Sequence, residues 1–122
     1  GQVDAVRFLL ANGADVKRAD KDWQTALGYA VLGSADDDKR KTVTGLLLEN
    51  GADPFLSDGY GAVPVREIVS LGYLEILKTL NFTDKVPCDR VLPRKGDDSI
   101  VELARKNEQD EIVKYLQSIG CR

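Results

Sequence analysis

The side chains of this chain that could do chemistry include three consecutive aspartates, Asp36 to Asp38, followed directly by three basic residues, Lys39 to Lys41. Neighbouring carboxylates can bind calcium, but an EF-hand loop needs alternating ligands, a glycine and a final glutamate, and that spacing is missing. Two interpretations remain. The acids form a lip that selects a basic partner, or they lie in a solvated loop that begins a helix, whose positive end they favour. We favour the second.

Groups that could carry catalysis are scarce in the sequence. The chain has no histidine, which removes the commonest acid–base residue and metal ligand and every Ser-His or Cys-His arrangement. It also has no phosphate-cradling glycine-rich loop, Cys-x-x-Cys pair or nucleophile elbow. We therefore expect no enzyme activity, no cofactor and no metal site.

A second candidate site is the long connector from Asn81 to Asp98, which contains Pro87, Cys88 and Pro93. Connections longer than about 12–15 residues in compact folds often carry function. Four basic side chains of the connector are candidate contacts for an anionic ligand, either a phosphate or an acidic peptide: Lys85, Arg90, Arg94 and Lys95. The alternative, which we favour, is a plain extended hairpin.

Composition limits the partners and the compartment. The 122 residues carry 17 basic and 20 acidic side chains, a formal charge of −3, so the basic footprint of a nucleic-acid binder is missing. No apolar run approaches the roughly 20 residues of a membrane span, and no signal-peptide pattern occurs. Two cysteines, Cys88 and Cys121, are too few for a disulfide framework. We expect neither a membrane nor a nucleic-acid partner, and an intracellular, cytoplasmic or nuclear location.

The elements that position these residues are short helices that recur along the chain. The letters NGAD occur at residues 12–15 and again at residues 50–53, each time after an apolar stretch. Four such stretches predict amphipathic helices. Their marker leucines are spaced by 38, 33 and 36 residues: Leu9, Leu47, Leu80 and Leu116. The glycine of NGAD suits a left-handed helix end. Three further helices are predicted over residues 25–32, 63–70 and 99–106.

The units share more than their leucines. The second unit contains Asp20, then residues 25–30 (TALGYA) and 51–53 (GAD), and the third contains residues 58–65 (DGYGAVPV). In this pattern the chain resembles ankyrin-repeat proteins, whose units of about 33 residues run turn, helix, loop, helix. The resemblance covers nearly the whole chain. It implies an all-α, ankyrin-like α-solenoid of about three and a half helix-turn-helix repeats with hairpin fingers.

The resemblance also implies an organisation into units. We expect one domain over residues 1–122, with units at 1–19 (partial), 20–57, 58–96 (with the long connector) and 97–122 (a degenerate, capping unit). Gly1 aligns with the loop between paired helices, so we expect further repeats to precede it in a longer protein, with coverage by another chain as the alternative. The last unit is rich in charged side chains, so we expect it to form the polar cap that ends the array.

Departures from the family pattern predict local differences. The family's histidine, which hydrogen-bonds the turns of neighbouring repeats, is replaced by Gly28, Arg66 and Glu102, so these turns need other partners. About five extra residues precede the second helix of the second unit, and about three more lie between the third and fourth units. Because insertions in repeat proteins map to loops, we expect loops at both places.

The resemblance implies partner contacts at the hairpin tips and on the exposed side of the first helix of each unit. The matching positions are Lys21, Asp22, Trp23, Gln24, Leu32, Gly59, Tyr60, Ser70 and Leu71. Trp23 stands where the family places a glycine, at a turn that often needs a positive φ. Trp23 is either an aromatic anchor that projects outward or a ring that folds back onto the adjacent hairpin. The same two interpretations apply to Tyr60.

These expectations favour a non-catalytic protein–protein interaction module that binds another protein, or a sister domain of the same polypeptide. A regulatory or inhibitory domain within a larger enzyme or transcription factor is the first alternative. A phosphate- or nucleotide-sensing domain is the second, with Trp23 stacking on the base and the connector's basic side chains holding the phosphate.

Overall fold

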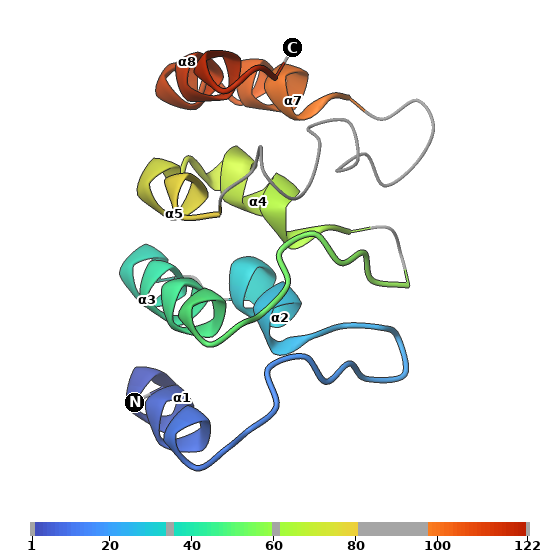
Figure 1. The fold of residues 1–122 in the computed structure, drawn as a ribbon, viewed down its shortest axis with the longest axis vertical. Coiled ribbons are helices and arrows are strands. Elements are labelled where there is room, and N and C mark those ends of the chain that lie inside the picture. Colours follow the sequence, from blue (N-terminus) through green and yellow to red (C-terminus); the bar gives the residue numbers. More distant parts are fainter. Residues whose placement is uncertain (1, 34–35, 60–61, 81–97, 122) are drawn as a thin grey trace. The chain divides into compact units, whose positions relative to one another are not determined.

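The described part of the chain is helical throughout. The computed structural model describes residues 2–33, 36–59, 62–80 and 98–121, and no strand occurs within these ranges. Figure 1 shows the helices in chain order: α1 (Gln2–Ala11), α2 (Ala26–Gly33), α3 (Asp37–Glu49), α4 (Pro64–Leu71), α5 (Leu74–Lys78), α7 (Ile100–Lys106) and α8 (Asp110–Ser118). The predicted all-α fold is confirmed. None of the described helices is long and apolar enough to cross a membrane.

The chain divides into two compact units, Gly1–Pro64 and Val65–Arg122. In the first unit, α3 packs against both α1 and α2; in the second, α7 packs against α8. Each unit therefore contains the paired helices that the repeat pattern requires. The assignment of one domain with four repeat units stays a prediction.

The helices begin where the sequence supplies a start signal. Pro64 is the first residue of α4, where its missing N–H costs nothing because the first turn lacks acceptors. Ser99 caps α7, since its hydroxyl accepts a hydrogen bond from the backbone N–H of Glu102 at 3.1 Å. The predicted first helices of the units are thus correct to within one residue. The helix predicted around Leu80 is shorter than expected, because α5 ends at Lys78 and Leu80 lies in the following turn.

Each NGAD motif ends its helix with the same hydrogen bonds. Gly13 and Gly51 have φ angles of 84° and 94°. The N–H of Ala14 donates to the carbonyl of Leu9, and that of Ala52 to the carbonyl of Leu47, both at 3.0 Å. These are Schellman helix ends, in which a residue with positive φ lets the chain satisfy two of the last carbonyls. The glycine of the motif is therefore a backbone requirement in both copies.

Glu108 occupies the equivalent position after α7 and has a φ of 56°. Its N–H donates to the carbonyl of Arg105 at 3.0 Å, and the N–H of Gln109 donates to that of Ala104 at 2.9 Å. A left-handed conformation costs a residue with a Cβ about 1–2 kcal/mol, part of which glycine loses again as backbone entropy. We expect Glu108→Gly to raise the free energy of unfolding by about 0.5–1 kcal/mol, measured by urea denaturation followed by circular dichroism.

A glycine inside α8 is the matched control for that change. Lys114 is 75% exposed and lies in mid-helix, so Lys114→Gly is expected to lower the unfolding free energy by about 1 kcal/mol. Destabilisation by both glycines would mean that the backbone after α7 is not left-handed.

The run from Asp36 to Lys41, in the second repeat unit (residues 20–57), starts a helix. Asp36 caps α3 by accepting from the N–H of Lys39 at 3.1 Å, and α3 already begins at Asp37. The carboxylate of Asp37 lies 3.7 Å from the guanidinium of Arg40 and 3.5 Å from the ammonium of Lys41. The aspartates therefore sit at the positive end of a helix dipole, beside cations one turn later. The helix start that we favoured for the acidic run is therefore confirmed at residues 36–41, and the loop expected from the family spacing does not extend over these residues.

The core of each unit is built from the predicted apolar stripes. In the first unit Leu27, Val31 and Leu47 are buried. In the second unit the fully buried side chains include Val65, Ile68, Leu77, Ile100, Ile112 and Leu116. One core position of the first unit is polar, because Thr44 of α3 is 0% exposed and its hydroxyl makes no hydrogen bond within the described residues.

The buried hydroxyl of Thr44 gives a prediction. A buried polar group without a partner costs about 1–3 kcal/mol, and valine has nearly the same shape. We expect Thr44→Val to raise the unfolding free energy by about 1 kcal/mol in urea denaturation. Thr42, an exposed threonine of the same helix, is the control, and Thr42→Val should change stability little. A loss of stability at position 44 would show that its hydroxyl is satisfied in solution.

Turns in the second unit find substitutes for the family's histidine. The guanidinium of Arg66 donates to the backbone carbonyl of Asp98 at 2.8 Å. The side-chain amide of Gln109 donates to the carbonyl of Ser70 at 3.2 Å and packs over Gly72, where a Cβ would lie 2.5 Å from its amide oxygen. The expectation that these turns need other hydrogen-bond partners is thus met at Arg66.

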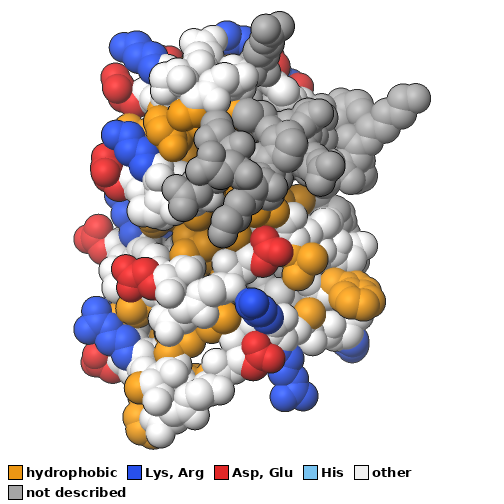
Figure 2. Space-filling model, viewed as in Figure 1, with side chains coloured by type: hydrophobic (Ala, Val, Ile, Leu, Met, Phe, Trp, Pro, Cys, Tyr) orange, Lys and Arg blue, Asp and Glu red, His pale blue; other side chains and the backbone are white. Residues whose placement is uncertain are grey.

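Charged side chains cover the last two helices, as the predicted polar cap requires. Figure 2 shows basic and acidic side chains over α7 and α8, which lie at the top of the view. Arg105 and Glu102 form an ion pair at 2.7 Å, and Lys106 pairs with Asp98 at 2.7 Å. The carboxylate of Asp98 raises the pKa of Lys106.

Cys121 is buried, and its sulfur is disulfide-bonded. The other cysteine of the chain, Cys88, lies outside the described residues. The intracellular location inferred from the cysteine count stays a prediction.

Candidate functional site

The candidate site is the first finger, residues 15–25, which joins α1 to α2 and extends beyond the helices (Figure 1). A hydrogen bond joins the two sides of the finger, because the N–H of Asp20 donates to the carbonyl of Gln24 at 2.9 Å. The carboxylate of Asp20 accepts from the N–H groups of Asp22 and Gln24 at 2.8 and 3.1 Å. It also accepts from the hydroxyl of Tyr29 on α2. One aspartate therefore fixes the finger and ties it to the following helix.

The hydrogen bonds to Asp20 also set its charge. The Tyr29 hydroxyl, followed by the two backbone N–H groups, lowers the pKa of the Asp20 carboxyl. Hydrogen bonds donated to a carboxylate stabilise its ionised form. Asp20 is therefore ionised at neutral pH and acts as a structural acceptor.

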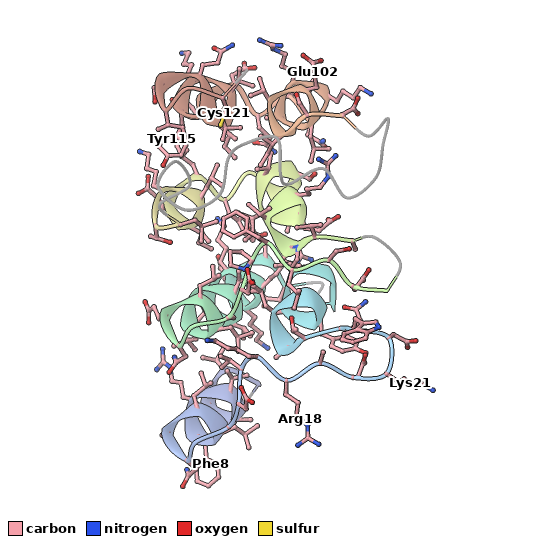
Figure 3. The ribbon with its side chains drawn as sticks, turned by 45° about the vertical axis from the view of Figure 1, so that its right-hand side comes forward. Phe8, Arg18, Lys21, Glu102, Tyr115 and Cys121 are labelled. Carbon is pink, nitrogen blue, oxygen red and sulfur yellow. The ribbon has the colours of Figure 1, made fainter. Side chains whose placement is uncertain are left out.

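Trp23 stands at the turn of this finger in a conformation that few residues adopt. Its φ is 63°, and its N–H donates to the carbonyl of Asp20 at 3.0 Å. Bulky residues rarely occupy this left-handed region, which costs them about 1–2 kcal/mol. The side chain is 67% exposed, so burial of the indole offsets little of that cost. The first finger thus presents an aromatic ring in a strained backbone. Nearby, Lys21 points outward at the tip (Figure 3).

The second finger, which joins α3 to α4, contacts the first directly. The N–H of Gly59 donates to the carbonyl of Asp22 at 2.8 Å. A Cβ at position 59 would lie 2.9 Å from that same oxygen and 3.6 Å from the Trp23 ring, so only glycine fits without a shift. Asp58 repeats the role of Asp20, because its carboxylate accepts from the N–H of Ala62 at 2.8 Å. Asp22, Trp23 and Gly59 therefore form one small surface within the first unit.

Comparison with known proteins agrees with this geometry. A family model described as ankyrin repeats (many copies) matches residues 1–36. Cyclin-dependent kinase 4 inhibitor B of Bos taurus is 30% identical over 120 residues, which cover 97% of this chain and 84% of that protein. The chain belongs to the ankyrin-repeat family. It is a protein–protein interaction module, as the predicted function requires at this coarse level.

The predicted contact residues of this ankyrin-repeat chain fall into three groups. Lys21, Asp22, Trp23 and Gln24 lie together on the first finger, with Gly59 beside them. Ser70 and Leu71 end α4 in the second unit, where both are half-buried and the Ser70 carbonyl holds Gln109. The remaining positions fall outside what the structure describes: Tyr60, the Leu32 side chain, Lys85, Arg90, Arg94 and Lys95.

Two residues that shape the site were not among the predicted contacts. Asp20 belongs to the ankyrin pattern, but its hydrogen bonds depend on how the chain folds back over it. Tyr29 reaches Asp20 from nine residues away and is 56% exposed. The signal available in the sequence was a tyrosine one turn into the helix predicted over residues 25–32. Within the described ranges, no group of three or more His, Cys, Asp or Glu residues could hold a metal ion.

Proposed function

We propose that this module binds its partner protein through the first finger, with Trp23 as the anchor and Lys21, Asp22 and Gly59 around it. The observation that carries the proposal is the combination at Trp23 of a left-handed backbone and a ring that is 67% exposed. Strained residues persist where the surroundings hold them, and they cluster at binding sites. Exposed tryptophans are among the side chains that most often dominate binding energy.

The surroundings of Trp23 support the assignment. Hydrogen bonds of Asp20 and Tyr29 hold the finger backbone on one side of Trp23, and the hydrogen bond of Gly59 holds it on the other side. The Trp23 ring is therefore preorganised for binding. A preorganised anchor loses little conformational entropy when it binds. Lys21 and Asp22 flank it with opposite charges, which favours a partner surface with both signs. Gln24, Leu32, Tyr60, Ser70 and Leu71 stay proposed outer contacts.

A pull-down of partners on the immobilised chain tests this proposal. Trp23→Ala should strongly reduce recovery of the proteins that bind the native chain. Phe8 provides a matched control, since it is also an aromatic residue 67% exposed in the first unit, and Figure 3 shows it on α1 facing away from the finger. Phe8→Ala should leave recovery unchanged. Equal recovery by native chain and Trp23→Ala, with both folded by circular dichroism, would remove Trp23 as the anchor.

A second candidate function is inhibition of a separate protein kinase, which differs from the regulatory domain within a larger protein that the sequence suggested. It is favoured because the relative that matches 97% of this chain is by name an inhibitor of cyclin-dependent kinase 4. Adding the chain to that kinase with its cyclin is expected to lower phosphate transfer in a dose-dependent way, with Trp23→Ala less effective. Full kinase activity at a large excess of the chain would reject this candidate.

A further inference from the structure

The carboxylate of Asp22 differs from those of Asp20 and Asp58 on the two fingers. Asp20 and Asp58 use their carboxylates to hold backbone N–H groups of their own turns. Asp22 contributes only its backbone: its N–H donates to Asp20, and its carbonyl accepts from Gly59. Within the described residues its carboxylate makes no hydrogen bond and no ion pair, although the residue is half-buried. A carboxylate with less water around it gains more from a nearby cation than an exposed one does.

The cations of the first finger itself do not pair with Asp22. Figure 3 shows Lys21 and Arg18 extended outward from the finger in different directions. Neither side chain forms an ion pair within the part of the chain that the structure describes. After the Tyr29 hydroxyl and the backbone N–H groups, the charge of Lys21 adds to the lowering of the pKa of Asp20. Asp22 is therefore open to a cation from another molecule.

The next residue, Trp23, offers a second group that attracts cations. Its side chain is 67% exposed, and its indole N–H makes no hydrogen bond within the described ranges. A cation is attracted to the face of an indole within about 6 Å of the ring centre. Because the Cα atoms of consecutive residues are only about 3.8 Å apart, one cation on the ring is also within reach of the Asp22 carboxylate.

We propose that the first finger recognises an arginine of its partner protein, whose guanidinium stacks on the Trp23 ring while its N–H groups donate to the Asp22 carboxylate. This inference rests on the proposed function, because it names the chemistry of the group that binds at Trp23. Arginine fits better than lysine, since a planar guanidinium can lie on a ring and donate hydrogen bonds from its edge. Two parallel charge-assisted hydrogen bonds to one carboxylate add strength and fix the orientation.

The chain's single tryptophan provides the readout, because its indole N–H gives one NMR signal that belongs to Trp23. We expect N-acetyl-arginine amide to shift this signal saturably, with a Kd on the order of 10 mM, and added salt to weaken the binding. N-acetyl-lysine amide should bind more weakly. N-acetyl-citrulline amide keeps the planar shape but lacks the charge, and it should bind about tenfold more weakly than the arginine compound.

Paired variants assign the charge to Asp22. Asp22→Asn should weaken the binding of N-acetyl-arginine amide by about tenfold and lower the recovery of the partner protein in the pull-down. The variant should fold normally, since the contacts of Asp22 within the fingers use its backbone. Glu49→Gln is the matched control. It removes the same charge from an exposed residue of α3, outside both fingers, and should leave both measurements unchanged.

Failure of this inference and failure of the proposed function give different results. A Trp23 signal that does not move with N-acetyl-arginine amide, or that moves equally with the citrulline compound, would overturn the arginine assignment. Full recovery of the partner by Asp22→Asn would also overturn it, while loss of the partner by Trp23→Ala would keep Trp23 as the anchor. Full recovery by Trp23→Ala would reject the proposed function, and the arginine assignment with it.

Discussion

Replacing Trp23 with glycine is expected to stabilise the chain and, in the same variant, to weaken partner binding by about thirtyfold or more. Glycine adopts the observed φ of 63° without strain, so the free energy of unfolding should rise by about 0.5–1 kcal/mol. Loss of an aromatic hot spot costs about 2 kcal/mol or more of binding energy, which corresponds to the thirtyfold change. Denaturation and calorimetry on the purified proteins would measure the two quantities.

Trp23→Ala separates the two effects. Alanine keeps a Cβ in the left-handed region, so this variant should lose binding as glycine does but gain little stability. A Trp23→Gly protein that is less stable than the native chain would show that the indole packs on the neighbouring finger. That outcome would favour the second reading of Trp23, a ring folded back onto the adjacent hairpin.

The second large effect is a contrast between two equivalent leucines. Leu116→Ala should lower the free energy of unfolding by about 2–5 kcal/mol, because the side chain is 0% exposed and its removal leaves a cavity. Leu9→Ala removes the same atoms from a side chain that is 56% exposed and should cost less than about 1 kcal/mol. Urea denaturation followed by circular dichroism would compare them.

The contrast tests the repeat assignment together with the open face of α1. A similar large loss at both positions would mean that another part of the protein covers Leu9. A small loss at both would mean that Leu116 does not lie in a packed core. Each result contradicts a different part of the structural account.

Local signals in the sequence were enough to predict most of the helices. The glycine of NGAD and the marker leucines act within a few residues, so the Schellman ends at Gly13 and Gly51 and the buried Leu47 follow from the pattern. For the extra residues of the second repeat unit (residues 20–57), family spacing suggested a loop, whereas the acidic run itself predicted a helix start. The local chemistry of Asp36 as a cap and Asp37 beside Arg40 and Lys41 makes helix instead.

The backbone of the proposed site could be predicted from the sequence better than its hydrogen bonds could. A tryptophan at a family glycine predicted an unusual backbone, and Trp23 has the positive φ. The link from Tyr29 to Asp20 and the bond from Gly59 to Asp22 join residues 9 and 37 positions apart. Such contacts depend on how the fingers pack, which helical periodicity does not encode.

Hydrogen exchange of the full chain, with and without a partner recovered in the pull-down, tests the central claim most directly. Binding through the first finger predicts slower exchange at residues 18–24 and at Gly59, with the amides of α7 and α8 unchanged. Protection confined to α7 and α8, with exchange in the finger unaltered, would contradict the claim that Trp23 and its neighbours form the recognition surface.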